Sequence, residues 1–276
     1  MFANAEAYER FMGRWSRSIA ARLKDCINLP DEGQLLDIGS GTGSLAFVLA
    51  HRTAKTRVVG IDPSKEYVAY ANNANPFPDR IQFEIGDAQH LRFADATFAS
   101  SLSLLVFNFI PDPLTALQEA RRVTKPGGLI AAAVWDYGGE MRMLRTFWDA
   151  AASIDDRARK LDECHLPLCR AGELTHLWKK VGLTNIYERP LDIEMQFDSF
   201  EDYWHPFLLG QGPAGAYAAS LDTDTLRRLR NELKRRLSPS AEEVPFLLPA
   251  RAWGVCGTVP LVTPPCRTPS DFFAIG

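Results

Sequence analysis

The sequence predicts an α/β fold in which a mostly parallel sheet carries helices on both faces. Short apolar runs alternate with amphipathic segments from residue 34 onward, and such alternation requires the crossover connections of a parallel sheet. Seven apolar runs are expected to be strands, over residues 34–38, 57–61, 81–85, 98–107, 129–135, 184–196 and 245–255. A chain of 276 residues has room for one such domain and an appended cap.

An amphipathic helix is predicted before the sheet, over residues 5–23. Its apolar and aromatic residues recur at spacings of three and four, at Ala7, Tyr8, Phe11, Trp15, Ile19 and Leu23. An aromatic stripe of this kind must cover another part of the protein. We therefore expect residues 1–33 to form an N-terminal helical cap.

The remaining elements follow in order along the chain. Helices are expected over residues 44–52, 64–73 and 113–124, with a turn at residues 125–128 before the fifth strand. Residues 34–139 would then form a cofactor-binding core. Residues 140–258 would complete that core and add substrate-cap insertions, of which the 48 or so residues between the last two strands would cover one edge of the sheet. Four prolines in residues 259–276 predict a tail without regular structure.

Composition and charge narrow the class of protein. The hydrophobic share of 46% and the charged share of 24% are typical of a soluble globular protein. A net charge of −3 gives no general attraction to nucleic acid or to anionic lipid, and the basic run within residues 226–237 has the spacing of a solvated helix face. No apolar run is long enough to cross a bilayer and no secretory signal is evident, so a cytoplasmic location is expected.

The five cysteines do not form a recognisable metal or disulfide pattern. Cys26, Cys164, Cys169, Cys256 and Cys266 are odd in number, scattered, and never spaced as Cys-x-x-Cys. We expect them to be reduced and mostly structural. Since no His, Cys or acidic set has metal-ligand spacing, no catalytic cation is expected either.

A glycine-rich turn follows the first predicted strand. Residues 35–38 are Leu-Leu-Asp-Ile, and residues 39–43 are Gly-Ser-Gly-Thr-Gly. Glycines let the backbone turn sharply and approach a ligand at the carboxyl end of a strand. The spacing differs from the Gly-x-Gly-x-x-Gly of dinucleotide sites, and Asp37 precedes the first glycine by two positions. The turn is therefore suited to the amino-acid part of a nucleotide-like ligand, whose cationic groups Asp37 would favour.

Two further acidic residues follow the next two predicted strands. Asp62 ends the second strand, 25 positions after Asp37, where a carboxylate can accept both hydroxyls of a ribose. Its alternative role is to cap the helix that begins near Ser64. Asp87 follows the third strand within Gly-Asp-Ala, where it can accept an adenine amino group while the next backbone N–H donates to the ring. Three acidic positions at three consecutive strand ends predict an adenosyl ligand.

With these motifs the chain resembles the class I S-adenosylmethionine-dependent methyltransferases, particularly the group that includes ubiquinone and menaquinone biosynthesis enzymes. The resemblance covers roughly residues 5–258, through motifs at residues 35–43, 60–64, 86–88 and 121–128. It implies a Rossmann-like, seven-stranded, mostly parallel sheet with helices on both faces and a mainly helical cap. The implied cofactor is S-adenosyl-L-methionine, which leaves as S-adenosyl-L-homocysteine.

The resemblance also implies the cofactor-binding positions. They are Asp37, Gly39, Ser40, Gly41, Thr42 and Gly43 toward the methionine part, Asp62, Pro63 and Ser64 toward the ribose, Asp87 and Ala88 toward the adenine, and Ser103 and Leu104 near the amine. The chain departs from the family at Ala99, where relatives often carry aspartate, and in its proline-rich tail. The family's aspartate usually borders the strand rather than contacting the cofactor, and the resemblance does not explain the tail.

The catalytic and acceptor-binding residues are less constrained by the sequence. A sulfonium methyl is already activated, so the enzyme mainly aligns the acceptor for in-line displacement and excludes water. A general base helps only when the acceptor loses a proton. Candidate bases are Tyr8, His165, Tyr203 and His205, each of which has a packing role as its alternative.

Four residues in the regions expected to cover the site are candidates for binding a small-molecule acceptor. They are Asn108, Trp135, Trp204 and Gln211. Two alternatives to a methyltransferase remain open, a noncatalytic S-adenosylmethionine-binding regulatory protein and an NAD-dependent oxidoreductase. Nucleic acid is not an expected substrate, because the sequence lacks a basic aromatic surface and a motif for handling an extruded base.

Overall fold

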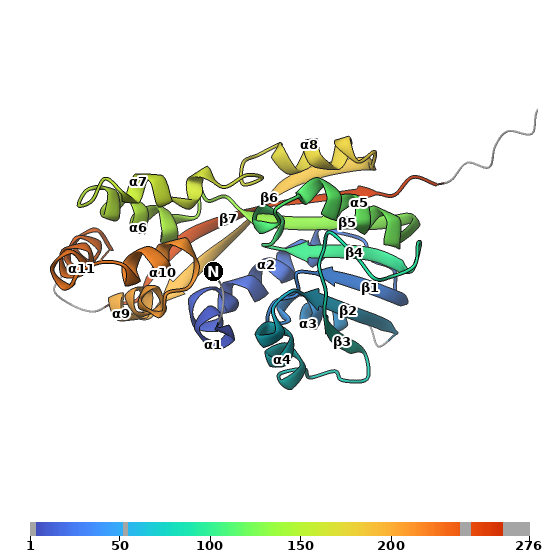
Figure 1. The fold of residues 1–276 in the computed structure, drawn as a ribbon, viewed down its shortest axis with the longest axis horizontal. Coiled ribbons are helices and arrows are strands. Elements are labelled where there is room, and N and C mark those ends of the chain that lie inside the picture. The colour runs from blue at the N-terminus through green and yellow to red at the C-terminus, as the bar shows by residue number, and fades with distance from the viewer. Residues whose placement is uncertain (1–3, 52–54, 238–243, 262–276) are drawn as a thin grey trace, which may run out of the picture.

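The computed structural model describes residues 4–51, 55–237 and 244–261. A seven-stranded sheet lies at its centre, in the order β3-β2-β1-β4-β5-β7-β6 (Figure 1). The strands are β1 (Gly33–Ile38), β2 (Thr56–Asp62), β3 (Ile81–Ile85), β4 (Phe98–Leu104), β5 (Thr124–Trp135), β6 (Thr184–Phe197) and β7 (Phe246–Thr258). Among these strands, β7 alone runs in the direction opposite to the other six. The predicted mostly parallel α/β fold is confirmed.

Helices cover both faces of the sheet, as the alternation of the sequence predicts. One face packs against α2 (Arg14–Asp25), α3 (Ser44–Ala50) and α4 (Lys65–Asn73), and the other packs against α5 (Pro113–Val123) and α8 (Glu173–Lys180). Neighbouring strand residues point to opposite faces, so Leu35 lies in the first core and Leu36 in the second. Helices therefore cover both faces of the core sheet, and a ligand can bind only at the ends of its strands.

The predicted N-terminal helix is not regular. It consists of α1 (Ala5–Tyr8), a π-helical turn η1 (Glu9–Gly13) and α2, which follow one another without a break. A π turn inserts an extra residue and so rotates the side chains on either side of it. The Glu9 carboxylate lies over Gly13, where a Cβ would come within 2.4 Å of its Cδ atom. The absence of a side chain at Gly13 lets the turn form there.

The fourth and fifth strands differ from their predicted bounds. β4 ends at Leu104 rather than at residue 107, because Leu105 adopts a φ of 61° and turns the chain into the short helix η2 (Phe107–Phe109). β5 begins at Thr124, so the turn expected at residues 125–128 is part of the strand. Gly127 has a φ of 80° and its N–H donates to the carbonyl of Val259 at 2.9 Å, which keeps the glycines paired.

A second group of helices lies beyond the carboxyl ends of the strands rather than along the outermost strand (Figure 1). The ends of β6 and β7 project past the core sheet, and the chain between them forms α9 (Phe200–Trp204), η4 (His205–Leu209), α10 (Gly212–Ala219) and α11 (Thr223–Leu237). The chain after β5 adds α6 (Arg142–Ala152), α7 (Ala158–Leu161) and η3 (Glu163–His165). These elements are called the cap below.

The cap and the sheet share one core. Phe147 of α6 stacks on Phe207 of η4 with ring centroids 4.4 Å apart, and Phe207 also meets Phe11 of the N-terminal segment at 5.3 Å. The cap is therefore held against η1 by aromatic packing. None of the described helices is long and apolar enough to cross a membrane.

Cysteine 266 and the tail expected after Pro260 lie largely outside the described residues. The four described cysteines, Cys26, Cys164, Cys169 and Cys256, are free thiols. Across the described ranges, no three His, Cys, Asp or Glu side chains come together as metal ligands would.

Candidate active site

A cavity of about 330 Å³ opens between the carboxyl ends of the strands, the N-terminal segment and the cap. Its position is where the strand order reverses, since β1 pairs with both β2 and β4. Open α/β sheets bind ligands at such a reversal, because the loops on its two sides lead to opposite faces and leave a crevice. The cavity volume is within the usual range for a small-molecule site.

The glycine turn after β1 forms one wall of this cavity. Gly39, Gly41 and Gly43 have φ values of 71°, 51° and 94°, a region that residues with a Cβ rarely adopt. A Cβ on Gly39 would come within 2.5 Å of Val106, whereas one on Gly41 would meet no atom within 4 Å. Gly41 therefore leaves open space beside the backbone, and a ligand can approach it closely.

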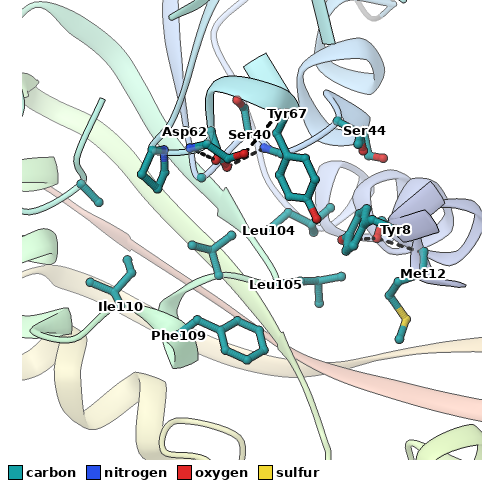
Figure 2. A pocket seen from close by; sticks show the side chains of 18 of the residues that line it. Tyr8, Met12, Ser40, Ser44, Asp62, Tyr67, Leu104, Leu105, Phe109 and Ile110 are labelled. Atoms are coloured by element: carbon teal, nitrogen blue, oxygen red, sulfur yellow. Dashed lines mark hydrogen bonds between the residues drawn. The ribbon is translucent and has the colours of Figure 1, made fainter. Parts of the chain in front are cut away.

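Asp62 connects this turn to the end of β2. Its Oδ2 atom accepts a hydrogen bond from the Gly41 N–H at 3.0 Å, and its Oδ1 atom accepts one from the Ser64 N–H at 2.9 Å. Ser64 itself caps α4 by accepting from the Tyr67 N–H. Burial raises the pKa of Asp62, and the two backbone donors oppose that shift. Figure 2 shows both bonds at the end of the cavity.

Asp37 is buried completely at the end of β1. Its Oδ2 atom accepts from the Ala46 N–H at 3.1 Å, and its Oδ1 atom has no hydrogen-bond partner. Burial raises the pKa of Asp37 to about 7. An unpartnered carboxylate oxygen is costly to bury, and a cationic ligand group would offset that cost.

Other buried polar atoms on the cavity wall are also unpartnered. They are Ser40 Oγ, Ser44 Oγ, Tyr67 Oη and Trp135 Nε1. Buried polar groups in folded proteins are almost always hydrogen-bonded, so a cluster of orphaned ones around a cavity indicates a polar ligand. The residues lining the cavity thus fit an adenosyl amino acid, which has hydroxyl, amino and carboxylate groups.

Asp87 lies at the mouth of the cavity and is half exposed. Its Oδ1 atom accepts from the backbone N–H of Gln89 at 2.9 Å, and its Oδ2 atom lies 3.4 Å from His90 Nδ1. Chiefly through the Gln89 bond, the pKa of Asp87 falls below its ordinary value. This carboxylate is therefore ionised at neutral pH and is an acceptor only.

The structure brings most of the predicted cofactor residues to the cavity wall. These are Asp37, Gly39, Ser40, Gly41, Thr42, Asp62, Pro63, Ser64, Asp87, Ala88 and Leu104. Two others lie behind the wall. Gly43 closes the turn by donating to the Ser40 carbonyl, and Ser103 Oγ donates to the Ile38 carbonyl at 2.8 Å, which joins β4 to β1.

The candidate bases separate clearly. Tyr8 lines the cavity, and its ring lies 5.6 Å from that of Tyr67, with both side chains on one wall in Figure 2. His165 and His205 are exposed outside the cavity, where they meet the Arg159 carbonyl and the Glu201 carboxylate. Tyr203 is buried in the cap core and donates to the Met143 carbonyl at 2.9 Å.

Tyr8 is poorly suited to accept a proton. Its hydroxyl lies 3.2 Å from Ser16 Oγ, and Ser16 donates its own proton to the Met12 carbonyl. The Tyr8 hydroxyl must therefore be the donor of that pair. Burial raises the pKa of Tyr8, so its anionic form is disfavoured further.

Of the four candidate acceptor-binding residues, only Trp135 lines the cavity. Asn108 is buried beside the Tyr137 hydroxyl, Trp204 packs within the cap, and Gln211 precedes α10. The neighbours of Gln211, Gly212 and Pro213, do reach the cavity.

Several wall residues were not anticipated from the sequence. Tyr67, Tyr137 and Glu163 come from α4, from the chain after β5 and from the cap. Tyr137 lies two residues after Trp135 at a strand end, so its position alone is a usable signal. Nothing in the local sequence distinguishes Glu163 from the other charged residues of the cap.

Fold and site together define a Rossmann-like protein with a polar cavity at the carboxyl ends of its strands, whose lining fits an adenosyl amino acid. A family profile described as a methyltransferase domain matches residues 36–132. That segment contains the glycine turn, Asp62, Asp87 and β4, which are the parts that form the cavity wall on the sheet side.

Curated relatives agree with this match. The Geobacter sulfurreducens ubiquinone/menaquinone biosynthesis C-methyltransferase UbiE is 33% identical over 119 residues, which cover 42% of this chain and 45% of that protein. The Synechocystis 2-methyl-6-phytyl-1,4-hydroquinone methyltransferase is 31% identical over 121 residues, 44% of this chain and 38% of that protein. The matched segment thus spans less than half the length of these relatives.

A solved structure shares the fold over most of the chain. Phosphoethanolamine N-methyltransferase 2 of Haemonchus contortus superposes with a TM-score of 0.57 at 18% identity, over 93% of this chain and 57% of that one. Through residues 36–132 the chain is similar to S-adenosylmethionine-dependent methyltransferases in sequence, and over most of its length it shares their fold.

Proposed function

We propose that the protein transfers the methyl group of S-adenosylmethionine to a small-molecule acceptor by in-line displacement. The observation that carries this proposal is the set of orphaned polar atoms around the cavity, at Asp37, Ser40, Ser44, Tyr67 and Trp135. Their number and burial support a ligand that is polar along most of its length.

Each strand end has a separate role toward the cofactor. The glycine turn and Asp37 would hold the amino-acid part, since Asp37 Oδ1 is free to accept from an ammonium group. Asp62 is 8% exposed and keeps lone pairs for the ribose hydroxyls beside its two backbone donors. Asp87, ionised at the mouth, would accept from the adenine amino group while the Ala88 N–H donates to the ring.

The bound cofactor supplies a methyl group on a positively charged sulfur. The chain would hold the acceptor in line with the carbon-sulfur bond and keep water away. Apolar side chains opposite Asp62 serve the second purpose, among them Leu104, Leu105 and Phe109 in Figure 2. Phe11 and Leu144 extend this wall toward the N-terminal segment and the cap.

The acceptor we propose is a small aromatic molecule. Phe109, Trp135 and Tyr137 give the acceptor side of the cavity flat apolar surfaces. The names of the two curated relatives, a quinone-biosynthesis enzyme and a hydroquinone methyltransferase, point the same way.

Calorimetric titration of the purified protein with S-adenosylmethionine, S-adenosylhomocysteine and NAD tests the cofactor. Adenosyl-ligand binding that is lost in Asp62→Ala and Asp87→Ala supports the assignment. NAD binding alone would favour an oxidoreductase, and a folded protein that binds neither ligand would overturn the proposal. Radiolabelled methyl transfer to an aromatic acceptor then separates an enzyme from a noncatalytic binding protein.

A further inference from the structure

Glu163 is a buried carboxyl group on the cap side of the cavity. It is 3% exposed, it lines the cavity, and it belongs to η3 rather than to any strand end. Its Oε2 atom accepts a hydrogen bond from Trp148 Nε1 of α6, and the Ala214 N–H of α10 also faces the carboxylate. Three cap segments therefore fix its position.

The hydrogen bond to Trp148 does not by itself account for a carboxyl group here. A glutamine side chain would accept from the same indole without the cost of burying an ionisable group. Among the described residues, Trp148 is the one side chain that donates to Glu163, and the backbone N–H groups of Glu163 and Ala214 supply the other interactions of its carboxylate. Since Glu163 also lines the cavity, a group bound there can reach it.

Charge within the cavity is one-sided. Its wall has four acidic residues, Asp37, Asp62, Asp87 and Glu163, and none of the described wall residues is Lys, Arg or His. The proposed function assigns the three aspartates to the cofactor, so Glu163 alone remains for the acceptor. An anionic acceptor would meet these carboxylates with no cationic side chain on the described wall to compensate them.

The surroundings of Glu163 favour its protonated form more than usual. Burial raises the pKa of Glu163 to about 7, and the neighbouring Asp162 raises it further. Asp162 forms an ion pair with Arg145 of α6. The other titratable groups that face Glu163 are the Tyr137 hydroxyl after β5 and the Cys169 thiol. Burial raises the pKa of both groups, so both are neutral at pH 7. Glu163 can therefore gain and lose a proton near neutral pH, as an efficient base must.

Resting on the proposed function, we propose that Glu163 is the general base that takes the proton of a neutral aromatic hydroxyl acceptor. As the acceptor attacks, the bond from sulfur to the methyl carbon breaks and its electrons stay on sulfur. The acceptor oxygen, or a ring carbon conjugated with it, forms the new bond to the methyl group. The hydroxyl proton goes to the Glu163 carboxylate, so the cation on sulfur and the anion on Glu163 disappear together.

The test is methyl transfer from radiolabelled S-adenosylmethionine between pH 5.5 and 9. Probe acceptors are 2-methylhydroquinone, which is neutral, and 4-hydroxybenzoate, which is similar in size but anionic. We compare the wild-type protein with Glu163→Gln and with Glu194→Gln, a control that removes an exposed carboxyl of β6. Calorimetry with S-adenosylhomocysteine checks that each variant keeps its cofactor site.

Wild-type turnover of 2-methylhydroquinone is expected to rise through about pH 7 and then level off. Glu163→Gln should lose at least about 100-fold in turnover and lose that inflection, while it binds S-adenosylhomocysteine like the wild type. Glu194→Gln should behave as the wild type in both assays. The anionic probe should be a poor substrate for all three proteins.

The base assignment fails if Glu163→Gln keeps the wild-type rate and pH profile, or if the anionic probe is preferred. Wild-type turnover without an inflection near pH 7 also overturns it, and this measurement needs no variant to fold. If the wild type binds S-adenosylhomocysteine but methylates neither probe, the aromatic-acceptor part of the proposed function fails together with the inference. Failure to bind the cofactor overturns the proposed function itself.

Discussion

The carboxylate of Asp62 holds the backbone of Gly41, through an N–H to Oδ2 bond of 3.0 Å, so the end of β2 fixes the glycine turn of β1. This link makes Asp62 a structural partner of the turn as well as a candidate ribose ligand. The alternative role predicted for Asp62 was to cap α4. Asp62 does accept from the Ser64 N–H just before that helix, but the side chain that caps the helix is that of Ser64.

We expect Asp62→Ala to lower both stability and cofactor affinity. Two buried backbone N–H groups would lose their acceptor, at a cost of about 1–3 kcal/mol in the free energy of unfolding. Loss of the ribose bonds should weaken S-adenosylhomocysteine binding roughly 10- to 100-fold. Urea denaturation and calorimetry measure the two effects. An unchanged affinity in a folded variant would remove Asp62 from the binding site.

Gly41→Ala should separate folding from binding. The substitution strains the backbone, because φ is 51°, at a cost of about 1–2 kcal/mol, but its Cβ meets no protein atom within 4 Å. The Cβ would instead occupy space beside the cavity, so affinity for S-adenosylhomocysteine should fall by about tenfold or more.

Two other glycines provide the controls for this experiment. Gly172 also has a positive φ and open space around a Cβ, but it lies outside the cavity, so Gly172→Ala should cost similar stability and leave affinity unchanged. Gly39→Ala adds a contact of 2.5 Å with Val106 and should destabilise more, by roughly 2–5 kcal/mol. Equal affinity losses in Gly41→Ala and Gly172→Ala would indicate strain alone.

The alternation of strands and helices and the glycine turn could be predicted, because both depend on local sequence patterns. The bounds of β4 and β5 were wrong because they depend on contacts with other segments. Leu105 leaves the strand in a positive φ, and the Lys125–Gly128 segment is a bulge within β5 that two backbone hydrogen bonds to Val259 hold in place. Propensity alone favours the opposite outcome at both places.

The candidate site divides in the same way. Residues that follow strands, such as Asp62, Asp87 and Trp135, reach the cavity because parallel strands end at one edge of the sheet. Cap residues depend on how helices far apart in sequence pack together. Exposed His165 and buried Glu163 are two positions apart in η3, and only the packing of α6 and α10 decides which of them faces the cavity.

Stability of the ligand-free protein should depend on pH through Asp37. Its pKa is raised from 3.8 to about 7 in the folded state, so between these values the folded protein binds more protons than the unfolded chain. The free energy of unfolding should therefore fall as pH rises from about 4 to 7. Glu163, with a pKa raised in the same direction, adds to this slope.

Asp37→Asn isolates this contribution, since its amide oxygen can still accept from the Ala46 N–H. The variant should show a flatter stability profile between pH 4 and 7, a difference on the order of a few kcal/mol across the window. Cofactor binding should show the reverse trend, with wild-type affinity for S-adenosylhomocysteine increasing toward pH 8 as Asp37 ionises. Identical profiles for the two proteins would contradict the buried-carboxyl explanation.

The N-terminal segment should loosen when its link to the glycine turn is removed. Thr42 Oγ1 donates to Glu9 Oε1 at 2.5 Å, and this bond joins the π turn to the turn after β1. Thr42→Val keeps the shape of the side chain but loses a charge-assisted bond of about 1.5–3 kcal/mol. Amide exchange in residues 5–16 should become faster, and affinity should fall by up to about tenfold. Arg17→Ala, which removes the exposed partner of Glu9, should change neither quantity appreciably.

Substitution of the remaining candidate bases should leave the rate of methyl transfer nearly unchanged. His165 and His205 lie outside the cavity, so His165→Ala and His205→Ala should keep turnover within about twofold of the wild type, well short of the effect of losing a base. Tyr203→Phe removes the bond to the Met143 carbonyl inside the cap and should cost about 1 kcal/mol of stability. Because Tyr203 does not reach the cavity, the pH profile of methyl transfer by Tyr203→Phe should match that of the wild type. A lost inflection in Tyr203→Phe, or a 100-fold lower rate in either histidine variant, would mean that the cap rearranges when the acceptor binds.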